Sequence, residues 1–243
     1  MGDERTAVPS TAFRPKIDPI RRVTAVRPPE FAPRLAYAAL LLAADRVVLA
    51  DTFAFSRQSG QNRARVRSSQ GPQWLTVPRR HGGLGVALTD VEIVEDGWRG
   101  RHRKALRAAY GMAPFYEHVA PTWDAVLDTP GPLADLAVAS VEWAARWLDA
   151  PAQIVRASSL PDAPGALPDV VGAVGAETLL TLPESADRDR EQVDVPVRVL
   201  AFEEARRRQA FPGFVPGLSV LDLVMNYGPA SADVLRRGIV GVR

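Results

Sequence analysis

The chain of 243 residues contains no cysteine, and this absence excludes several kinds of chemistry at once. Disulfide bonds, thiolate metal sites and a cysteine nucleophile all require a thiol, so none of them is available. Histidine is also scarce, and its three positions, His81, His102 and His118, are too scattered to indicate a histidine-based metal site. We therefore expect neither a metal centre nor a cofactor.

A long hydrophobic run is missing as well. The longest apolar segment, 35–44, is followed directly by Asp45 and Arg46 and falls short of the ~20 residues that a membrane-spanning helix needs. The first twenty residues are polar, contain proline and lack the apolar core of a signal peptide. These features predict a disordered lead-in at residues 1–21, no membrane span and a cytoplasmic location.

Neither sign of charge is in large excess, since the formal net charge is +2. Lysine occurs only at Lys16 and Lys104, so nearly all of the 30 basic residues are arginine. Two interpretations stay open: the arginines recognise phosphate or carboxylate groups, or they reflect a GC-rich genome, since Ala, Pro, Gly and Val are also plentiful. A nucleic-acid-binding protein would show a stronger positive excess with interleaved aromatic residues, so we do not expect a nucleic-acid partner.

The composition that is present, with 47% hydrophobic and 24% charged residues, is typical of a globular protein. Apolar patterns and turn-forming residues predict short strands and helices in the first two thirds of the chain. The predicted strands span 22–26, 46–50, 64–67, 73–77 and 88–94. The predicted helices span 33–44, 98–110, 113–127 and 132–148.

The last third alternates strands with helices at a spacing typical of α/β proteins. Its predicted strands span 152–156, 178–182 and 195–201, and its predicted helices include 167–174 and 231–237. The pattern predicts an α/β fold in which a mixed β-sheet is flanked by helices. We expect a single compact unit over residues 22–243 with a helical C-terminal end.

A further helix is signalled within the segment Phe214–Pro229. Ser219 is placed to act as its N-cap, and Asp222 follows three residues later, where it can complete a capping-box exchange of hydrogen bonds. Gly228 and Pro229 form a stop signal at the other end. By themselves these features predict only a short core helix. The aromatic residues Trp74, Trp98, Phe115 and Trp123 are likewise interpreted as core.

Several motifs in a fixed order carry a family resemblance. They are Asn62-Arg63, Gln73-Trp74-Leu75-Thr76-Val77-Pro78, Trp98, His102, Tyr110, Pro114-Phe115, Gln209, and the segment Phe214 to Gly228. Together they resemble the WbqC-like family of bacterial proteins, whose members are commonly encoded among genes for O-antigen and other surface glycans. The resemblance covers roughly residues 22–237. The chain departs from the family pattern at Arg27 and Ala54, where glutamine is usual, and at 182–187, where a Ser-Gly-rich turn is usual.

Four polar residues are site candidates on their own chemistry. Asn62 and Arg63 form an amide–guanidinium pair that can bind phosphate or carboxylate and orient a hydroxyl, although a structural pairing of Arg63 with Asp51 explains them equally well. Asp51 can act as a base or bind a sugar hydroxyl, or it can cap the following turn. His102 lies one helical turn from Trp98 and can act as an acid or a base, or be a packed, hydrogen-bonded core residue.

The resemblance implies a role in surface-polysaccharide biosynthesis, as a transferase or modifying enzyme acting on a nucleotide-activated or lipid-linked sugar. In this interpretation Asn62, Arg63 and Gln209 bind the substrate, while His102 or Asp51 moves a proton, and all five converge on one anionic ligand. The alternative is a non-catalytic sugar-nucleotide-binding or scaffolding protein, which the departures from the family pattern favour. The expected partner is a small-molecule substrate such as a sugar nucleotide. The oligomeric state stays open.

Overall fold

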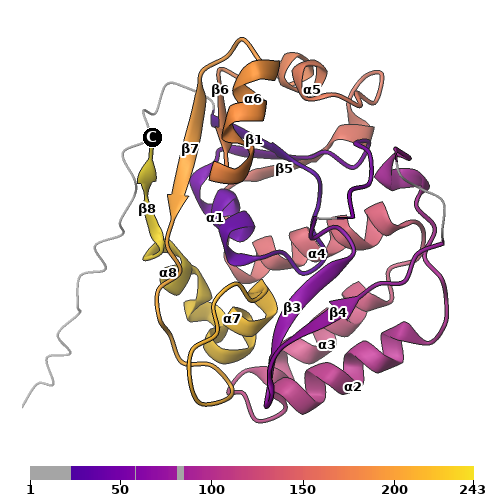
Figure 1. Ribbon diagram of the computed structural model, residues 1–243, viewed down its shortest axis with the longest axis vertical. Coiled ribbons are helices and arrows are strands. Elements are labelled where there is room, and N and C mark those ends of the chain that lie inside the picture. The colour runs from indigo at the N-terminus through magenta and orange to yellow at the C-terminus, as the bar shows by residue number, and fades with distance from the viewer. Residues whose placement is uncertain (1–22, 58, 81–84) are drawn as a thin grey trace, which may run out of the picture.

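A computed structural model describes residues 23–57, 59–80 and 85–243 (Figure 1). The expected lead-in at 1–21 and His81 lie outside the described residues. The described chain forms one compact unit, in which a mixed sheet is flanked by helices, and the predicted fold class is confirmed. Figure 1 shows the main sheet in the upper part of the molecule, with a separate hairpin and further helices below it.

The strands of the main sheet are β1 (Val23–Arg27), β2 (Arg46–Leu49), β5 (Gln153–Arg156), β6 (Thr178–Thr181), β7 (Val197–Phe202) and β8 (Ile239–Val242). Their spatial order is β5-β2-β1-β6-β7-β8. The first five are parallel, and β8, which the sequence does not predict, pairs antiparallel with β7. Counted along the chain, these strands follow the 3-2-1-4-5-6 order of a doubly wound sheet.

The helices are α1 (Leu35–Ala43), α2 (Trp98–Tyr110), α3 (Tyr116–Leu127), α4 (Leu133–Trp147), α5 (Leu167–Ala173), α6 (Ala186–Gln192), α7 (Val220–Tyr227) and α8 (Ser231–Arg236). Because successive side chains of a strand point to opposite faces, the sheet packs against two cores. Ala25 and Val47 belong to the larger core, with residues of α1 and α4. Val26 and Val48 belong to a second core, with residues of α5. Helices therefore cover both faces of the sheet.

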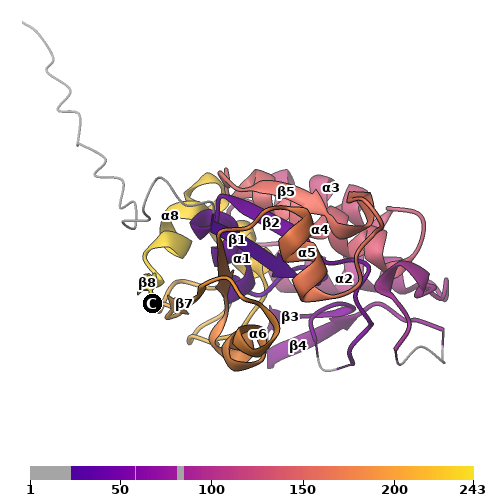
Figure 2. The ribbon, with the colours of Figure 1, turned by 90° about the horizontal axis from the view of Figure 1, so that it is seen from above.

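A long insertion separates β2 from β5. It begins with an antiparallel hairpin of β3 (Arg63–Ser68) and β4 (Gly71–Thr76) and continues through α2, α3 and α4. Figure 2, which views the molecule from above, shows β5, β2 and β1 side by side and the hairpin apart from them. One face of the hairpin is buried through Ala64, Val66 and Leu75, so the other face is free to line a ligand site.

Two predicted elements need correction. The strand expected at 88–94 is absent, and Leu88–Asp90 form a 3-10 helix instead. Leu88 N–H donates to the carbonyl of Phe53 in the loop after β2, and the pairing of Ile93 with Arg79 is an isolated bridge that does not extend into a ladder. The helix expected from residue 113 begins only at Tyr116, because the preceding residues form a turn in which Ala113 N–H donates to the carbonyl of Tyr110.

The N-cap predicted for α7 is confirmed, since Ser219 Oγ accepts a hydrogen bond from Leu221 N–H at 3.2 Å. The capping-box role of Asp222 is wrong, because its carboxylate bonds to other elements. Gly228 ends the helix with a φ of +50°, a conformation that favours glycine. No helix of the described chain is both long enough and apolar enough to cross a membrane.

Candidate functional site

A cleft of about 860 Å³ opens at the carboxyl ends of β1 and β6. From β1 the chain runs through α1 to β2 on one side of the sheet, and from β6 it runs through α6 to β7 on the other. The point at which the winding reverses is where α/β sheets commonly bind ligands. We call this space the switch-point cleft. The outer face of the β3–β4 hairpin and the loop after β2 also line it.

Charged side chains dominate the polar lining of the switch-point cleft. Among the described residues they are the arginines Arg27, Arg34, Arg63, Arg65 and Arg188, and the acids Glu30, Glu184 and Asp189. Arg27, Arg34 and Arg188 each lie within ion-pair distance of one or two of these acids. Neither Arg63 nor Arg65 has an ion-pair partner within the described chain. Two guanidinium groups are therefore available to an anionic ligand.

A polar bridge joins the two strand ends at the reversal point. Arg27 Nη1 donates to Ser185 Oγ at 2.6 Å and lies 3.8 Å from Asp189 Oδ2. Asp189 is buried and also accepts a hydrogen bond from Thr181 at the end of β6. A second contact spans the same crevice, because Arg34 pairs with Glu184. These contacts connect the segments after β1 and β6 at the floor of the cleft and place charged groups on its surface.

Glu30 is a second buried carboxylate of the cleft, besides Asp189. Its side-chain oxygens accept hydrogen bonds of 3.2 Å from the backbone N–H and from Nε of Arg34. Burial raises the pKa of Glu30, and the positive charge of Arg34 opposes that rise. A Cβ at Gly60 would lie 2.9 Å from Glu30 Cδ, so glycine there lets the loop after β2 close over the carboxylate. Such a carboxyl group is suited to hold or release a proton.

Trp74 contradicts the prediction of a core residue, because 53% of it is exposed. It lies opposite Arg65 in the hairpin register and lines the cleft. Arg63 Cζ lies 4.8 Å and Arg65 Cζ 5.8 Å from the indole centroid. Trp98 and Trp123 are fully buried, as predicted, and Phe115 is partly buried. The hairpin therefore presents one indole and two guanidinium groups together.

Of the five predicted site residues, only Arg63 lines the switch-point cleft. Asp51 is fully buried and binds Arg156 Nε at 2.7 Å and Ser158 Oγ at 2.7 Å, which ties the end of β2 to the end of β5. Its ion-pair partner is thus Arg156 and not Arg63. Asn62 Nδ2 donates to the carbonyl of Val77 at 3.0 Å.

His102 lies within the larger core, beside the rings of Phe31 and Trp98. Its Nε2 lies 3.1 Å from the carbonyl oxygen of Thr76, to which it donates, and its buried Nδ1 has no partner within the described residues. Burial lowers the pKa of His102 to about 4. This is the packed, hydrogen-bonded arrangement that the sequence left open as the alternative.

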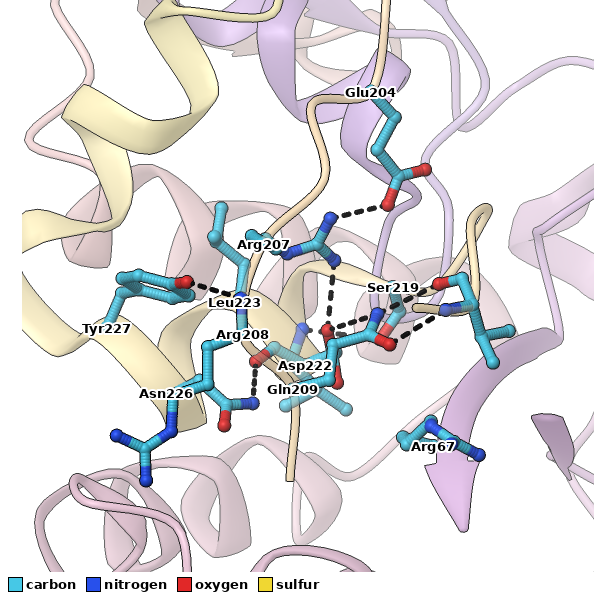
Figure 3. A network of polar contacts seen from close by, with 12 residues as sticks. Arg67, Glu204, Arg207, Arg208, Gln209, Ser219, Asp222, Leu223, Asn226 and Tyr227 are labelled. Atoms are coloured by element: carbon cyan, nitrogen blue, oxygen red, sulfur yellow. Dashed lines mark hydrogen bonds and ion pairs between the residues drawn. The ribbon is translucent and has the colours of Figure 1, made fainter. Parts of the chain in front are cut away.

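Gln209 belongs to a buried network around Asp222 (Figure 3). Gln209 Nε2 donates to Asp222 Oδ2 at 3.2 Å and to the carbonyl of Val215 at 2.8 Å. Arg207 Nη2 donates to the same carboxylate oxygen at 2.9 Å and Nη1 reaches Glu204. Burial raises the pKa of Asp222, and the Arg207 charge opposes that rise.

The network reaches the cleft through the backbone. Glu204 Oε2 accepts a hydrogen bond of 2.7 Å from Gly217 N–H, and Gly217 lies on the cleft rim against Arg65. Ser219 N–H in turn donates to the carbonyl of Arg65 at 2.8 Å. Figure 3 shows Arg207 between Glu204 and Asp222, with Gln209 beside it. Gln209 therefore belongs to the buried hydrogen-bond network that stabilises the Gly217 side of the cleft, although it does not line the cleft itself.

Four cleft residues were not predicted as site residues from the sequence: Glu30, Arg34, Arg65 and Glu184. The sequence of β3 did contain a pattern that indicates Arg65. Its arginines alternate with Ala64 and Val66, which are buried on the inner face of the strand. Strand alternation thus places Arg63 and Arg65 on one outer face. No local pattern marks Glu30 or Glu184. Across the described segments, no three His, Asp or Glu side chains gather in a way that could hold a metal ion.

Fold and site together define an α/β protein with an arginine-lined cleft at the reversal point of a doubly wound sheet. The chain belongs to the WbqC-like protein family, whose model matches residues 28–234. The protein named Uncharacterized protein Rv1507c, from Mycobacterium tuberculosis (strain ATCC 25618 / H37Rv), is 24% identical over 218 residues, which cover 85% of this chain and 94% of that relative. No solved structure matches the chain.

The positions at which this chain departs from the usual family pattern gather at the cleft. Arg27 and Ala54 both line it, as do Glu184 and Ser185 from the altered turn after β6. Arg27 and Ser185 are also bonded to each other. The departures therefore lie in the lining of the cleft.

Proposed function

We propose that the chain binds an activated sugar, carried on a nucleotide or lipid phosphate, in the switch-point cleft, as part of surface-polysaccharide biosynthesis. Membership of the WbqC-like family supports the pathway, because members commonly accompany genes for surface glycans. The observation that carries the binding role is the pair of guanidinium groups of Arg63 and Arg65, which lie against the exposed ring of Trp74 and have no ion-pair partner among the described residues. Arginine forks bind phosphate oxygens, and an aromatic face packs against a sugar or base ring.

The proposed reaction is transfer of a group to or from the bound sugar, with Glu30 as the residue that moves the proton. Glu30 lines the cleft and its pKa is raised by burial, whereas Asp51 and His102 lie outside the cleft lining. A carboxyl group whose pKa is raised by burial accepts and holds a proton more readily than an ordinary exposed carboxylate. Of the five site residues predicted from the sequence, Arg63 binds the substrate in this proposal. Gln209 stabilises the wall of the cleft through its hydrogen bonds to Asp222 and Val215.

Thermal-shift screening against sugar nucleotides tests the binding role, with the full chain and a panel that varies base and sugar. We expect at least one sugar nucleotide to raise the melting temperature, and R63A/R65A to lose that shift. E92Q is a suitable control, because Glu92 is exposed and lies outside the cleft lining. If neither sugar nucleotides nor lipid-linked sugar phosphates bind, the proposal is wrong.

Glu30→Gln separates an enzyme from a binding protein. We expect this variant to bind the identified ligand and to lose turnover when the substrate is incubated with candidate donors and followed by mass spectrometry. Unchanged turnover in the variant would contradict the role of Glu30, and no turnover in the wild-type chain would favour a non-catalytic binding or scaffolding role. A cytoplasmic location and the absence of a nucleic-acid partner are part of the proposal, to be tested by cell fractionation and by titration with DNA and RNA.

A further inference from the structure

The outer face of the β3–β4 hairpin is an unusual surface for a strand pair. Its inner face buries Ala64, Val66 and Leu75 in the core. Its outer face places Arg65 directly opposite Trp74, with Arg63 two residues away on the same side. All three outer residues line the switch-point cleft. We call these three residues the hairpin clamp.

Packing does not account for the exposure of Trp74. Trp98, Trp123 and Trp143 are each 1% exposed, whereas Trp74 is 53% exposed. An indole in this position leaves apolar surface in water, which is unfavourable for folding. Arg63 and Arg65 lie 4.8 Å and 5.8 Å from its centroid and offset part of this cost by cation–π contact. The remaining exposed ring surface is suited to a flat aromatic ligand.

The charges of the clamp distinguish it from the rest of the cleft. Arg27, Arg34 and Arg188 are each engaged by a carboxylate, whereas Arg63 and Arg65 have none within ion-pair distance in the described chain. Adjacent arginine forks bind phosphate oxygens bidentately. A ring-stacking surface beside phosphate-binding groups matches a nucleotide, in which an aromatic base and phosphates are joined by one sugar.

We propose that the activated group enters the switch-point cleft on a nucleoside diphosphate, with the base stacked on Trp74 and the phosphates bound by Arg63 and Arg65. This inference rests on the proposed function and selects the nucleotide carrier over the lipid carrier. A polyprenyl phosphate needs a continuous apolar surface for its chain. The cleft lining instead mixes charged and polar residues with apolar ones, of which Val26, Pro28, Phe53 and Leu167 are the largest among the described residues besides Trp74.

Binding of nucleoside diphosphates, inorganic pyrophosphate and farnesyl diphosphate to the full chain tests this inference. Tryptophan fluorescence and calorimetry are suitable measurements, because Trp74 is the most exposed indole of the described chain. We expect the best nucleoside diphosphate, from a panel with all common bases, to bind at least about ten times more tightly than pyrophosphate and farnesyl diphosphate. Trp74→Leu should remove most of this preference and leave pyrophosphate binding unchanged.

Three control variants test the separate roles of the aromatic ring and of the guanidinium groups. Trp74→Phe should retain the preference for nucleotides, because phenylalanine also presents an aromatic face. Arg63→Ala with Arg65→Ala should weaken all three diphosphates, and circular dichroism establishes that the variant is folded. Arg80→Ala should change none of them, since Arg80 is highly exposed, pairs with Glu92 and lies outside the cleft lining.

The possible outcomes separate this inference from the proposed function. If farnesyl diphosphate binds most tightly, or if Trp74→Leu leaves the nucleotide preference intact, the nucleotide inference is wrong while a phosphate-bearing substrate in the cleft is retained. Equal binding of pyrophosphate and nucleotides would also overturn it. If none of the probes binds, the inference is overturned, and the proposed function then depends on the intact sugar conjugates in the thermal-shift screen.

Discussion

Arg27 at the end of β1 donates a hydrogen bond of 2.6 Å to Ser185 Oγ, which lies 158 positions further along the chain in the turn after β6. Both residues belong to segments in which this chain departs from the usual family pattern. The bond therefore joins these two segments at the floor of the switch-point cleft.

The two substitutions R27Q and S185A should be non-additive in stability. A hydrogen bond from a charged donor contributes about 1.5–3 kcal/mol, and contacting residues show coupling of at least about 0.5 kcal/mol. We expect each single variant to lower the free energy of unfolding and the double variant to lose less than the two losses combined. Urea denaturation of the four proteins measures this coupling. Strict additivity would show that the bond contributes nothing of its own.

Glu184→Gln should strengthen the binding of phosphate-bearing ligands several-fold. Glu184 occupies the guanidinium of Arg34 across the crevice, and both side chains are more than 40% exposed. An exposed ion pair contributes only about 0–1 kcal/mol, so the variant should stay folded while Nη2 of Arg34 becomes available to an anion and Nε keeps its bond to Glu30. Glu92→Gln removes a more exposed pair away from the cleft and should leave affinity unchanged. Calorimetric titration with pyrophosphate decides the matter, and weaker binding to E184Q would contradict the prediction.

His102 should make the fold less stable in mild acid. Its pKa is lowered from 6.5 to about 4 by burial, so the unfolded chain takes up a proton that the folded chain excludes. Stability from this residue is complete above pH 6.5 and declines as the pH falls toward 4, by up to about 3 kcal/mol. Glu30 and Asp222, whose pKa values are raised, act in the opposite direction.

The variant His102→Gln isolates the contribution of the imidazole. Glutamine can still donate to the carbonyl of Thr76 but does not titrate. The difference in unfolding free energy between the wild type and H102Q, measured in urea from pH 7.5 to 4.5, should narrow as the pH falls. A difference that does not change with pH would show that His102 is not the group responsible.

Asp222→Asn should destabilise the chain by about 3 kcal/mol, because removing one member of a buried ion pair leaves the other charge incompletely compensated. Arg207 and Asp222 are 3% and 0% exposed, and Gln209 and Tyr110 also bond to this carboxylate. Asp233→Asn is the matched control, since Asp233 pairs with Arg236 at the surface. The two variants are compared by urea denaturation, and equal small losses would argue against a structural role for the network.

Local patterns were sufficient to predict most strands and helices and the α/β class. Strand alternation, the Ser219 cap and the Gly228 stop act through neighbouring residues, so they can be read along the chain. The same reasoning failed for residues 88–94, whose backbone hydrogen bonds are divided among the loop after β2, the segment after β4 and Leu133. Local patterns also could not predict how exposed an individual side chain is. Trp74 was predicted to be a core residue, but it is 53% exposed.

The composition of the cleft was decided only by the tertiary structure. Arg27, Glu30, Arg63, Trp74 and Glu184 meet because the order of the parallel strands places the carboxyl ends of β1 and β6 side by side and the hairpin against them. Strand order depends on contacts between segments far apart in sequence, so it cannot be predicted from local periodicity. For the same reason the sequence could identify polar residues able to bind a substrate, but only the fold could separate Arg63, which lines the cleft, from His102 and Asp51, which are held by partners elsewhere.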